Sequence, residues 1–210
     1  MKIYHIRKLS GQDTDFRKTI LNALAATAQY KQNNRCEVNV YIASGFFDDV
    51  ENFPYNNAVA SNLSSELQGV DHVYLIGAYS GRTELMALSN RLTQGGCRTH
   101  AYYKWRFHAK IFVITINGNP IFEIIGSSNM TWSAYCGVSR NNNNNNLFSP
   151  NSECDLVIFD DEMINVPIDP SPTTMALRYE PDDNDGVTLE RHMWDILQIL
   201  KDVSVPTNEL

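Results

Sequence analysis

The stretch "FHAKIFVITINGNPIFEIIGSSN", residues 107–129, decides the fold because it holds two apolar runs around a short polar turn. Two β-branched runs joined by Asn and Gly residues are typical of a β-hairpin. The turn is centred on either Asn117-Gly118 or Gly118-Asn119. We therefore expect two buried antiparallel strands, with Gly126 and a polar Ser-Ser-Asn segment closing the second.

The first of these strands carries a histidine and a lysine, His108 and Lys110, in an otherwise apolar run. Side chains at positions i and i+2 of a strand point the same way, and opposed residues of a strand pair project to one side of the sheet. One turn opposes His108 to Ser127, and the other opposes it to Asn129. Both registers therefore predict the same four polar side chains on one face: His108, Lys110, Ser127 and Asn129.

These four side chains suit the chemistry of a phosphate group. Lysine and asparagine donors fit its non-bridging oxygens, and an imidazole can act as nucleophile or as proton carrier. A His-x-Lys pair alone is more often an accident of a polar strand end. The Ser/Asn segment on the neighbouring strand and the basic surroundings favour a phosphate site, with Lys110, Ser127 and Asn129 as the phosphate ligands.

The charge of the chain is unevenly distributed. The net charge is −7, but residues 160–185 hold eight acidic side chains against the single Arg178. Residues 85–122 contain no Asp or Glu, and their basic side chains can attract phosphate. A solvated face with counter-charges elsewhere explains the same pattern equally well. The basic residues are Arg91, Arg98, Lys104, Arg106 and Lys110.

Composition predicts one soluble domain. The 210 residues are 43% hydrophobic and 20% charged, and no apolar run approaches the roughly 20 residues of a membrane span. The first residues lack the apolar region of a secretory signal, so we expect a cytoplasmic protein that does not contact membranes. The four cysteines are scattered without a CxxC pair, so we expect neither a disulfide framework nor a metal.

Apolar strands alternate with amphipathic helices along the chain, which predicts an α/β domain with a largely parallel or mixed sheet. We expect a catalytic domain over residues 1–160, and an acidic loop with a closing helix over residues 161–210 that packs on the same domain. The Asn141–Asn146 run is expected to be a surface loop. Helices are predicted at 14–31, 61–68, 83–96 and 187–203, and strands at 36–47, 72–80, 98–103 and 154–159 besides the hairpin.

The motif "HAK" at 108–110, followed by "GSSNMT" at 126–131, resembles the HxK…GSxN signature of the phospholipase D superfamily. The similarity is closest to its single-motif nucleases, including the metal-independent restriction-endonuclease branch. "NSE" at 151–153 resembles the downstream N-x-E element. The family's aspartate, five residues after the lysine, is Thr115 here, expected on the opposite face from His108. The resemblance implies a phospholipase D-like mixed β-sheet flanked by helices.

The resemblance also implies a mechanism and a partner. Family members use two histidines at one phosphate, whereas this chain has one HxK motif, so the resemblance implies a homodimer with one shared site. His108 would be the nucleophile in one copy and the acid in the other. When two imidazoles lie at one phosphate near neutral pH, one of them is neutral and the other is protonated. Glu153 would orient the imidazole. No cofactor and no metal is implied, and the implied catalytic residues are His108, Lys110, Asn129 and Glu153.

The substrate expected is a nucleic acid, DNA rather than RNA. The basic, aromatic sequence around Lys104, Trp105 and Arg106 provides contacts for a polyanion, although each ring alone fits a strand core as well. Nothing after residue 160 is large enough for a separate DNA-reading domain. Cleavage is therefore poorly sequence-specific, or a separate targeting subunit supplies specificity. The alternatives are a phospholipid phosphodiesterase and a catalytically idle nucleic-acid-binding subunit of the same fold.

Overall fold

The computed structural model describes residues 1–8, 15–45, 47, 63–105, 107–130, 153–169, 171, 174–177 and 188–204. The Asn141–Asn146 run, Arg106 and most of the acidic stretch after 177 lie outside these ranges. The elements are β1 (Lys2–Lys8), α1 (Asp15–Asn34), β2 (Val38–Ser44), β3 (His72–Ala78), the 3-10 turn η1 (Tyr79–Gly81), α3 (Arg82–Gln94), β4 (Thr99–Lys104), β5 (Ile111–Ile116), β6 (Asn119–Gly126), β7 (Glu153–Phe159), β8 (Thr174–Leu177) and α5 (Leu189–Val203).

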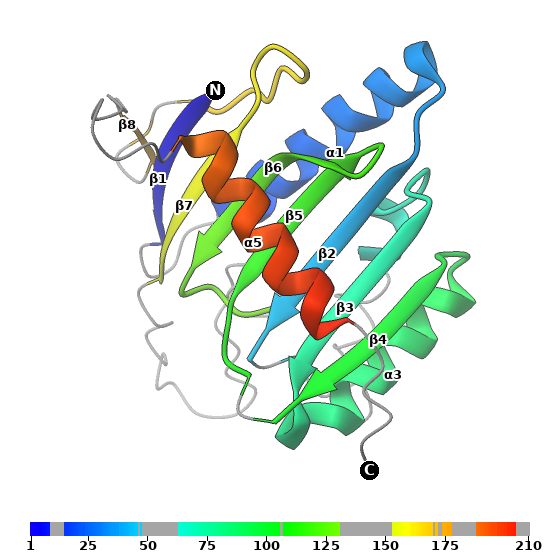
Figure 1. Ribbon diagram of the computed structural model, residues 1–210. Helices are drawn as coiled ribbons and strands as arrows, with labels where there is room; N and C mark the ends of the chain where they lie inside the picture. The colour runs from blue at the N-terminus through cyan, green and yellow to red at the C-terminus, as the bar shows by residue number, and fades with distance from the viewer. Residues whose placement is uncertain are drawn as a thin grey trace, which may run out of the picture.

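The strands form one eight-stranded sheet in the order β4-β3-β2-β5-β6-β7-β1-β8 (Figure 1). β2, β3 and β4 are parallel to one another, and every other neighbouring pair is antiparallel. In the parallel half, α3 connects β3 to β4, and the antiparallel half includes the hairpin expected from the sequence. The expected α/β class, a mixed sheet flanked by helices, is therefore confirmed.

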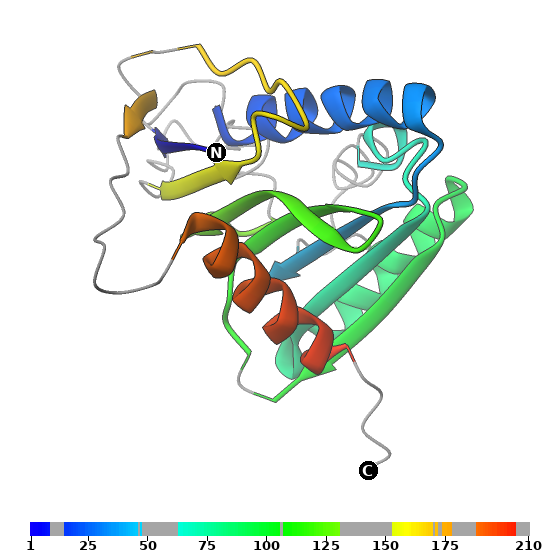
Figure 2. The same ribbon diagram turned by 45° about the horizontal axis from the view of Figure 1, so that its top comes forward.

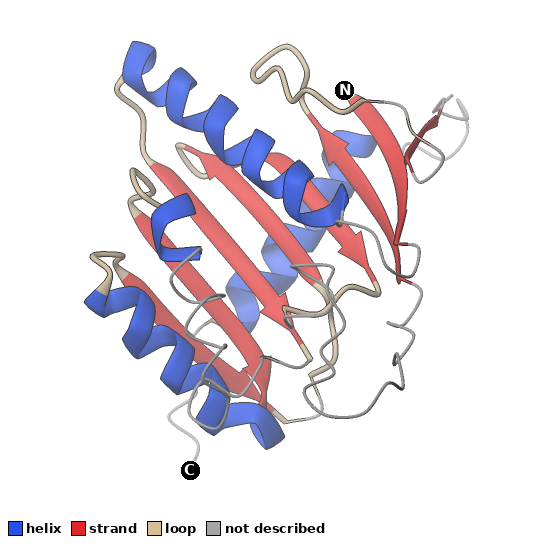
Figure 3. Ribbon diagram, turned by 180° about the vertical axis from the view of Figure 1, so that it is seen from behind, coloured by secondary structure: helices blue, strands red, loops and turns tan. Residues whose placement is uncertain are grey.

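Helices cover both faces of the sheet. α1 and α3 lie on one face and α5 crosses the other, as Figures 2 and 3 show from two further directions. Ile20 of α1 and Leu85 of α3 are fully buried in the larger core. Leu197 and Leu200 of α5 are fully buried in a second core against β2, β3 and β5. Because both faces of β2 are covered, all of its residues are buried.

The expected C-terminal helix is present and begins at Leu189, two residues after the expected start. The Thr188 side chain accepts a hydrogen bond from the Arg191 backbone N–H at 3.1 Å, which caps the first turn of α5. The division of the chain at residue 160 stays a prediction. No helix among the described residues is long and apolar enough to span a membrane.

Two strands were not expected from the sequence. β1 and β8 pair with each other, and β8 lies within the stretch that we expected to be a long acidic loop. β8 has only four residues and an irregular burial pattern, so it carries no clear alternation for sequence reasoning to detect.

The hairpin register differs from both expected registers by one residue. The turn is Asn117-Gly118, the first of the two alternatives, and both residues have positive φ values of 50° and 82°. A bulge between Ile114 and Thr115 then shifts the pairing, so that Ile111 opposes Ile125. An extra residue in one strand exchanges the two faces of everything beyond it. Neither expected register is therefore observed, and the argument that placed Ser127 opposite His108 or Lys110 fails.

Candidate functional site

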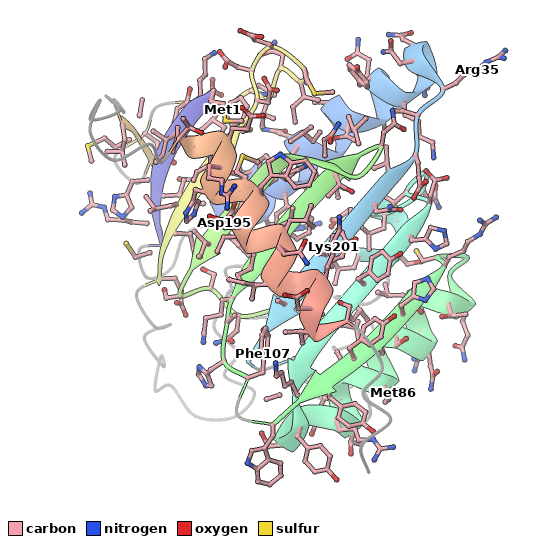
Figure 4. All side chains as sticks on the ribbon, viewed as in Figure 1. Met1, Arg35, Met86, Phe107, Asp195 and Lys201 are labelled. Atoms are coloured by element: carbon pink, nitrogen blue, oxygen red, sulfur yellow. The ribbon has the colours of Figure 1, made fainter. Side chains whose placement is uncertain are left out.

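One edge of the sheet brings together several strand ends. Because β5 is antiparallel to both β2 and β6, and β7 is antiparallel to β6, the amino ends of β5 and β7 meet the carboxyl ends of β2 and β6. The carboxyl ends of the parallel strands β3 and β4 lie at the same edge. We call it the His108 edge. Phe107, labelled in Figure 4, lies here between the ends of β4 and β5.

His108 and Lys110 precede β5 and interact directly. The Lys110 Nζ donates to His108 Nδ1 at 2.8 Å and to the His108 carbonyl at 3.0 Å. Phe107 and Ala109 pack against the core beneath α5, so strand-like alternation turns His108 and Lys110 the other way. An ammonium has donors only, so Nδ1 is the acceptor, and a neutral imidazole in this arrangement carries its proton on Nε2.

Gly45, directly after β2, supports the His108 ring. A Cβ atom at Gly45 would lie 3.2 Å from His108 Cδ2 and 3.3 Å from Nε2, closer than ordinary van der Waals contact. Only a residue without a side chain lets the imidazole pack this tightly against the backbone. Sequence reasoning missed Gly45, although a glycine that follows an apolar strand is a known signal of close approach.

Asn129 is oriented by Ser44, the last residue of β2. The Ser44 hydroxyl donates to Asn129 Oδ1 at 3.3 Å and accepts from the Met130 backbone N–H at 3.0 Å. This hydrogen bond orients the Asn129 amide, with its carbonyl oxygen toward Ser44 and its nitrogen, a donor, on the other side of the amide group. Ser44 and Gly45 are neighbours, so one short segment positions both Asn129 and His108. Ser44 was also missed by sequence reasoning.

Ser127 and Glu153 form a pair of their own. The Ser127 hydroxyl donates to Glu153 Oε2 at 2.5 Å and accepts from the Cys154 backbone N–H at 2.9 Å. A hydroxyl has one proton to donate, and Ser127 donates it in the hydrogen bond to Glu153. The expectation that Ser127 faces the substrate together with Lys110 is not supported by this arrangement, in which Ser127 positions Glu153.

Ser128 anchors this segment to the protein interior. Its backbone N–H and its hydroxyl donate to the two carboxylate oxygens of Asp155, at 3.0 Å and 2.5 Å, and both residues are buried. Burial raises the pKa of Asp155, and the hydrogen bonds from Ser128 oppose that rise. Ser128 therefore anchors the chain between Ser127 and Asn129 to the buried Asp155. Neither expected register predicted this contact.

Of the remaining residues singled out from the sequence, Lys104 and Trp105 lie at the same edge. Lys104 ends β4 and is exposed, and the following Trp105 is 70% exposed. Arg106 lies outside the described residues. Thr115, which takes the place of the family's aspartate, is buried at the other end of β5, where its hydroxyl faces the Asn39 carbonyl at 3.5 Å.

The other histidines have partners of their own. His72 and His100 face each other through ring nitrogens 3.0 Å apart, and His5 Nε2 lies 2.6 Å from Cys154 Sγ. His192 lies on α5. Among the residues that the structure describes, no group of three or more His, Cys, Asp or Glu side chains is arranged to hold a metal ion.

Comparisons with known proteins give no close relative. No family model matches this chain, and no curated protein does either. The chain is similar to a polyphosphate kinase from Porphyromonas gingivalis, at 17% identity and a TM-score of 0.45, over 78% of this chain and 22% of the kinase. It is also similar to TrmBL2, an archaeal chromatin protein with a novel mode of DNA binding, at 12% identity and a TM-score of 0.34, over 77% of this chain and 47% of that one. This chain spans less than half of either protein, and likeness at these TM-scores carries no argument about fold or activity.

Proposed function

We propose that this protein is a phosphodiesterase with phospholipase D-like chemistry, a metal-independent nuclease that cleaves DNA at a homodimer interface. The observation that carries the proposal is the convergence of His108, Lys110 and Asn129 at one sheet edge, with the imidazole held against Gly45. A nucleophile together with an ammonium and an amide donor that stabilise charge on the oxygens can cleave a phosphodiester.

The chemistry would proceed in two displacement steps. Nε2 of a neutral His108 attacks phosphorus, a nitrogen–phosphorus bond forms, and the bond from phosphorus to the leaving oxygen breaks. His108 of a second copy gives its proton to that oxygen. Water then attacks phosphorus and gives a proton back to the second His108, and the nitrogen–phosphorus bond breaks. Lys110 and Asn129 stabilise the charge that builds on the non-bridging oxygens.

The Lys110–His108 contact describes the enzyme before substrate arrives. Attack by Nε2 requires the ring proton on Nδ1, but Lys110 occupies Nδ1 as a donor. A bound phosphate attracts the ammonium more strongly than a neutral ring nitrogen does, because the phosphate is charged. Substrate thus draws Lys110 from Nδ1 and lets Nδ1 carry the proton, and Glu153 is the carboxylate proposed to accept the hydrogen bond from that N–H.

Cleavage assays in EDTA test the activity. Wild type is offered plasmid DNA, single-stranded DNA, RNA and phosphatidylcholine, and we expect cleavage of DNA that persists in the chelator. His108→Ala should abolish it by several orders of magnitude, and Lys110→Ala and Asn129→Ala should each slow it roughly 10²- to 10³-fold. Loss of activity in EDTA with recovery in magnesium contradicts the histidine mechanism. Cleavage of the lipid alone indicates a lipid phosphodiesterase, and binding without cleavage indicates an idle binding subunit.

Subunit mixing tests the dimer. One HxK motif supplies one histidine, whereas the two-step mechanism uses two, so a heterodimer of wild type and His108→Ala should be nearly inactive. Activity should then fall as the square of the wild-type fraction. A linear fall means that each chain carries a complete site and contradicts the shared-site proposal.

A further inference from the structure

Three aromatic rings and an arginine gather at the His108 edge, on elements that the proposed chemistry does not use. β3 and β4 pair in parallel with Ala78 opposite Lys104, so the next residues, Tyr79 and Trp105, lie side by side just beyond the paired strands. Their ring centroids are 5.3 Å apart. Tyr103 of β4 approaches Tyr79 edge-on at 5.4 Å.

The cation of this cluster comes from the first residue of α3. The Arg82 guanidinium lies 4.7 Å from the centroid of the Tyr103 ring, within the range of a cation–π contact. We call Tyr79, Arg82, Tyr103 and Trp105 the aromatic platform. It joins the three consecutive elements η1, α3 and β4, so its geometry is built by the fold.

The platform leaves large ring surfaces in water. Trp105 is 70% exposed, the highest value among the exposed large hydrophobic residues that the structure describes, and Tyr79 is 38% exposed. The Tyr79 and Trp105 rings are tilted by 48° and do not cover each other face to face. Each ring can therefore offer a face to a planar group from outside.

We propose that the aromatic platform stacks an unpaired nucleobase of a single-stranded nucleic acid next to the phosphate held at His108. This inference rests on the proposed function, because it takes the scissile phosphate to lie at His108. Trp105 and His108 are three residues apart, so their Cα atoms are within about 10 Å of each other. A strand whose phosphate reaches His108 can therefore place a neighbouring base on the platform.

Charge favours a polyanion over a protein or a second copy of this chain as the occupant. Arg82 and the exposed Lys104 flank the rings, and residues 85–122 contain no Asp or Glu. Glu84, in the first turn of α3, is the acidic residue beside the platform in sequence. Stacking on aromatic faces beside a basic groove is how single strands are held without sequence preference, whereas paired bases have their faces covered.

Binding measurements on a His108→Ala background, which keeps the substrate intact, test the platform. Fluorescence anisotropy compares a labelled mixed-sequence single strand, its duplex, and a strand of the same length built of abasic sites. We expect Trp105→Ala to weaken binding of the single strand roughly 5- to 150-fold, the range for one stacked base. Binding of the abasic strand should not change, and the salt dependence should stay the same because no phosphate contact is removed.

Two further variants control for indirect effects. Trp105→Phe keeps a ring and should restore most of the affinity, whereas a merely structural role would not discriminate between Phe and Ala in this way. Trp194→Ala is the matched control, since Trp194 is 37% exposed on α5 with the Lys201 ammonium 5.8 Å from its ring. It should bind the single strand as the parent does.

The outcomes separate this proposal from the proposed function. Equal binding of normal and abasic strands, equal losses for Trp105→Ala and Trp194→Ala, or a changed oligomeric state with unchanged binding would each overturn the platform. Hydrolysis of bis(4-nitrophenyl) phosphate in EDTA reports the His108 chemistry without any nucleobase. If that hydrolysis depends on His108 while the platform variants bind normally, the phosphodiesterase stands and the platform does not. If Trp105→Ala weakens binding of the single strand but no hydrolysis is detected, the platform is supported and the phosphodiesterase proposal is contradicted.

Discussion

Replacing Gly45 by alanine is the sharpest single perturbation of the proposed nucleophile. The added methyl would meet three atoms of the His108 ring at 3.2–3.3 Å, so the ring must yield by a few tenths of an ångström to reach ordinary contact. Gly45 is not among the glycines with positive φ, so alanine imposes no backbone strain there. A misplacement of 1 Å in an active site costs up to about 10²-fold in rate, and a shift of a few tenths should therefore cost roughly 3- to 10-fold.

The matched control is Gly77→Ala on β3. A methyl there would lie 3.2 Å from Leu85 Cδ2 and 3.2 Å from Phe47 Cε2, so it is as crowded as at Gly45, but by core side chains. We expect Gly77→Ala to lose about 1–3 kcal/mol of unfolding free energy by overpacking and to keep its turnover per folded molecule. Gly45→Ala should show the reverse, with nearly normal thermal unfolding and reduced turnover.

Two measurements decide the outcome for Gly45→Ala. Hydrolysis of bis(4-nitrophenyl) phosphate gives turnover, and the ¹⁵N resonances of the His108 ring report its position independently of any activity. Turnover equal to that of wild type with unchanged ring resonances would refute the reasoning, because the imidazole would then not be in contact with Gly45. Changed resonances with full turnover would mean that His108 moves but is not the nucleophile.

Three more predictions follow from single contacts. Gly126→Ala should be among the most destabilising substitutions, lowering the thermal midpoint strongly, because its methyl would collide with backbone and side-chain atoms of Asp155, including Cα at 2.6 Å. Asn129→Asp should slow turnover more than Asn129→Ala, since it replaces an amide donor by a carboxylate that repels phosphate. Glu123→Gln should flatten the pH dependence of unfolding. Burial raises the pKa of Glu123, and Glu123 at 3.6 Å raises the pKa of His192. Both raised pKa values stabilise the fold at low pH, so wild-type stability should fall as pH rises from about 4.3 to beyond about 6.5. Equal slopes for wild type and Glu123→Gln contradict this last prediction.

The order of strands and helices was predictable because local patterns carry it. Apolar alternation and glycine or capping signals predicted α1, α3, α5, the hairpin and most central strands. β1 and β8 were missed because many of their residues are only partly buried and their pairing is entirely long-range: β8 is the edge strand, and β1 pairs with β8 and β7. Which strand pairs with them depends on tertiary contacts that no local pattern encodes.

The site was predictable in composition but not in orientation. His108, Lys110, Asn129 and Glu153 were identified from residue types and a motif, and the structure brings them to one edge. The bulge was invisible in the sequence, because the extra residue, Ile121 of β6, lies in a largely apolar run and leaves the hydrophobic pattern almost unchanged. That single residue decides which of two adjacent serines faces the interior.

The bulge also gives Ser127 and Ser128 different hydrogen-bond partners. With the shifted register, the Gly126 backbone N–H bonds to the Lys110 carbonyl at 3.2 Å, and Ser128 turns inward to Asp155. Ser127 then lies beside β7, where its hydroxyl donates a hydrogen bond to Glu153. In the proposed mechanism, Lys110 and the Asn129 amide therefore bind the phosphate, and Ser127 acts through the carboxylate of Glu153, which it orients. In the register expected from the sequence, the serine would have been the ligand and the carboxylate would have lacked its hydrogen-bond donor.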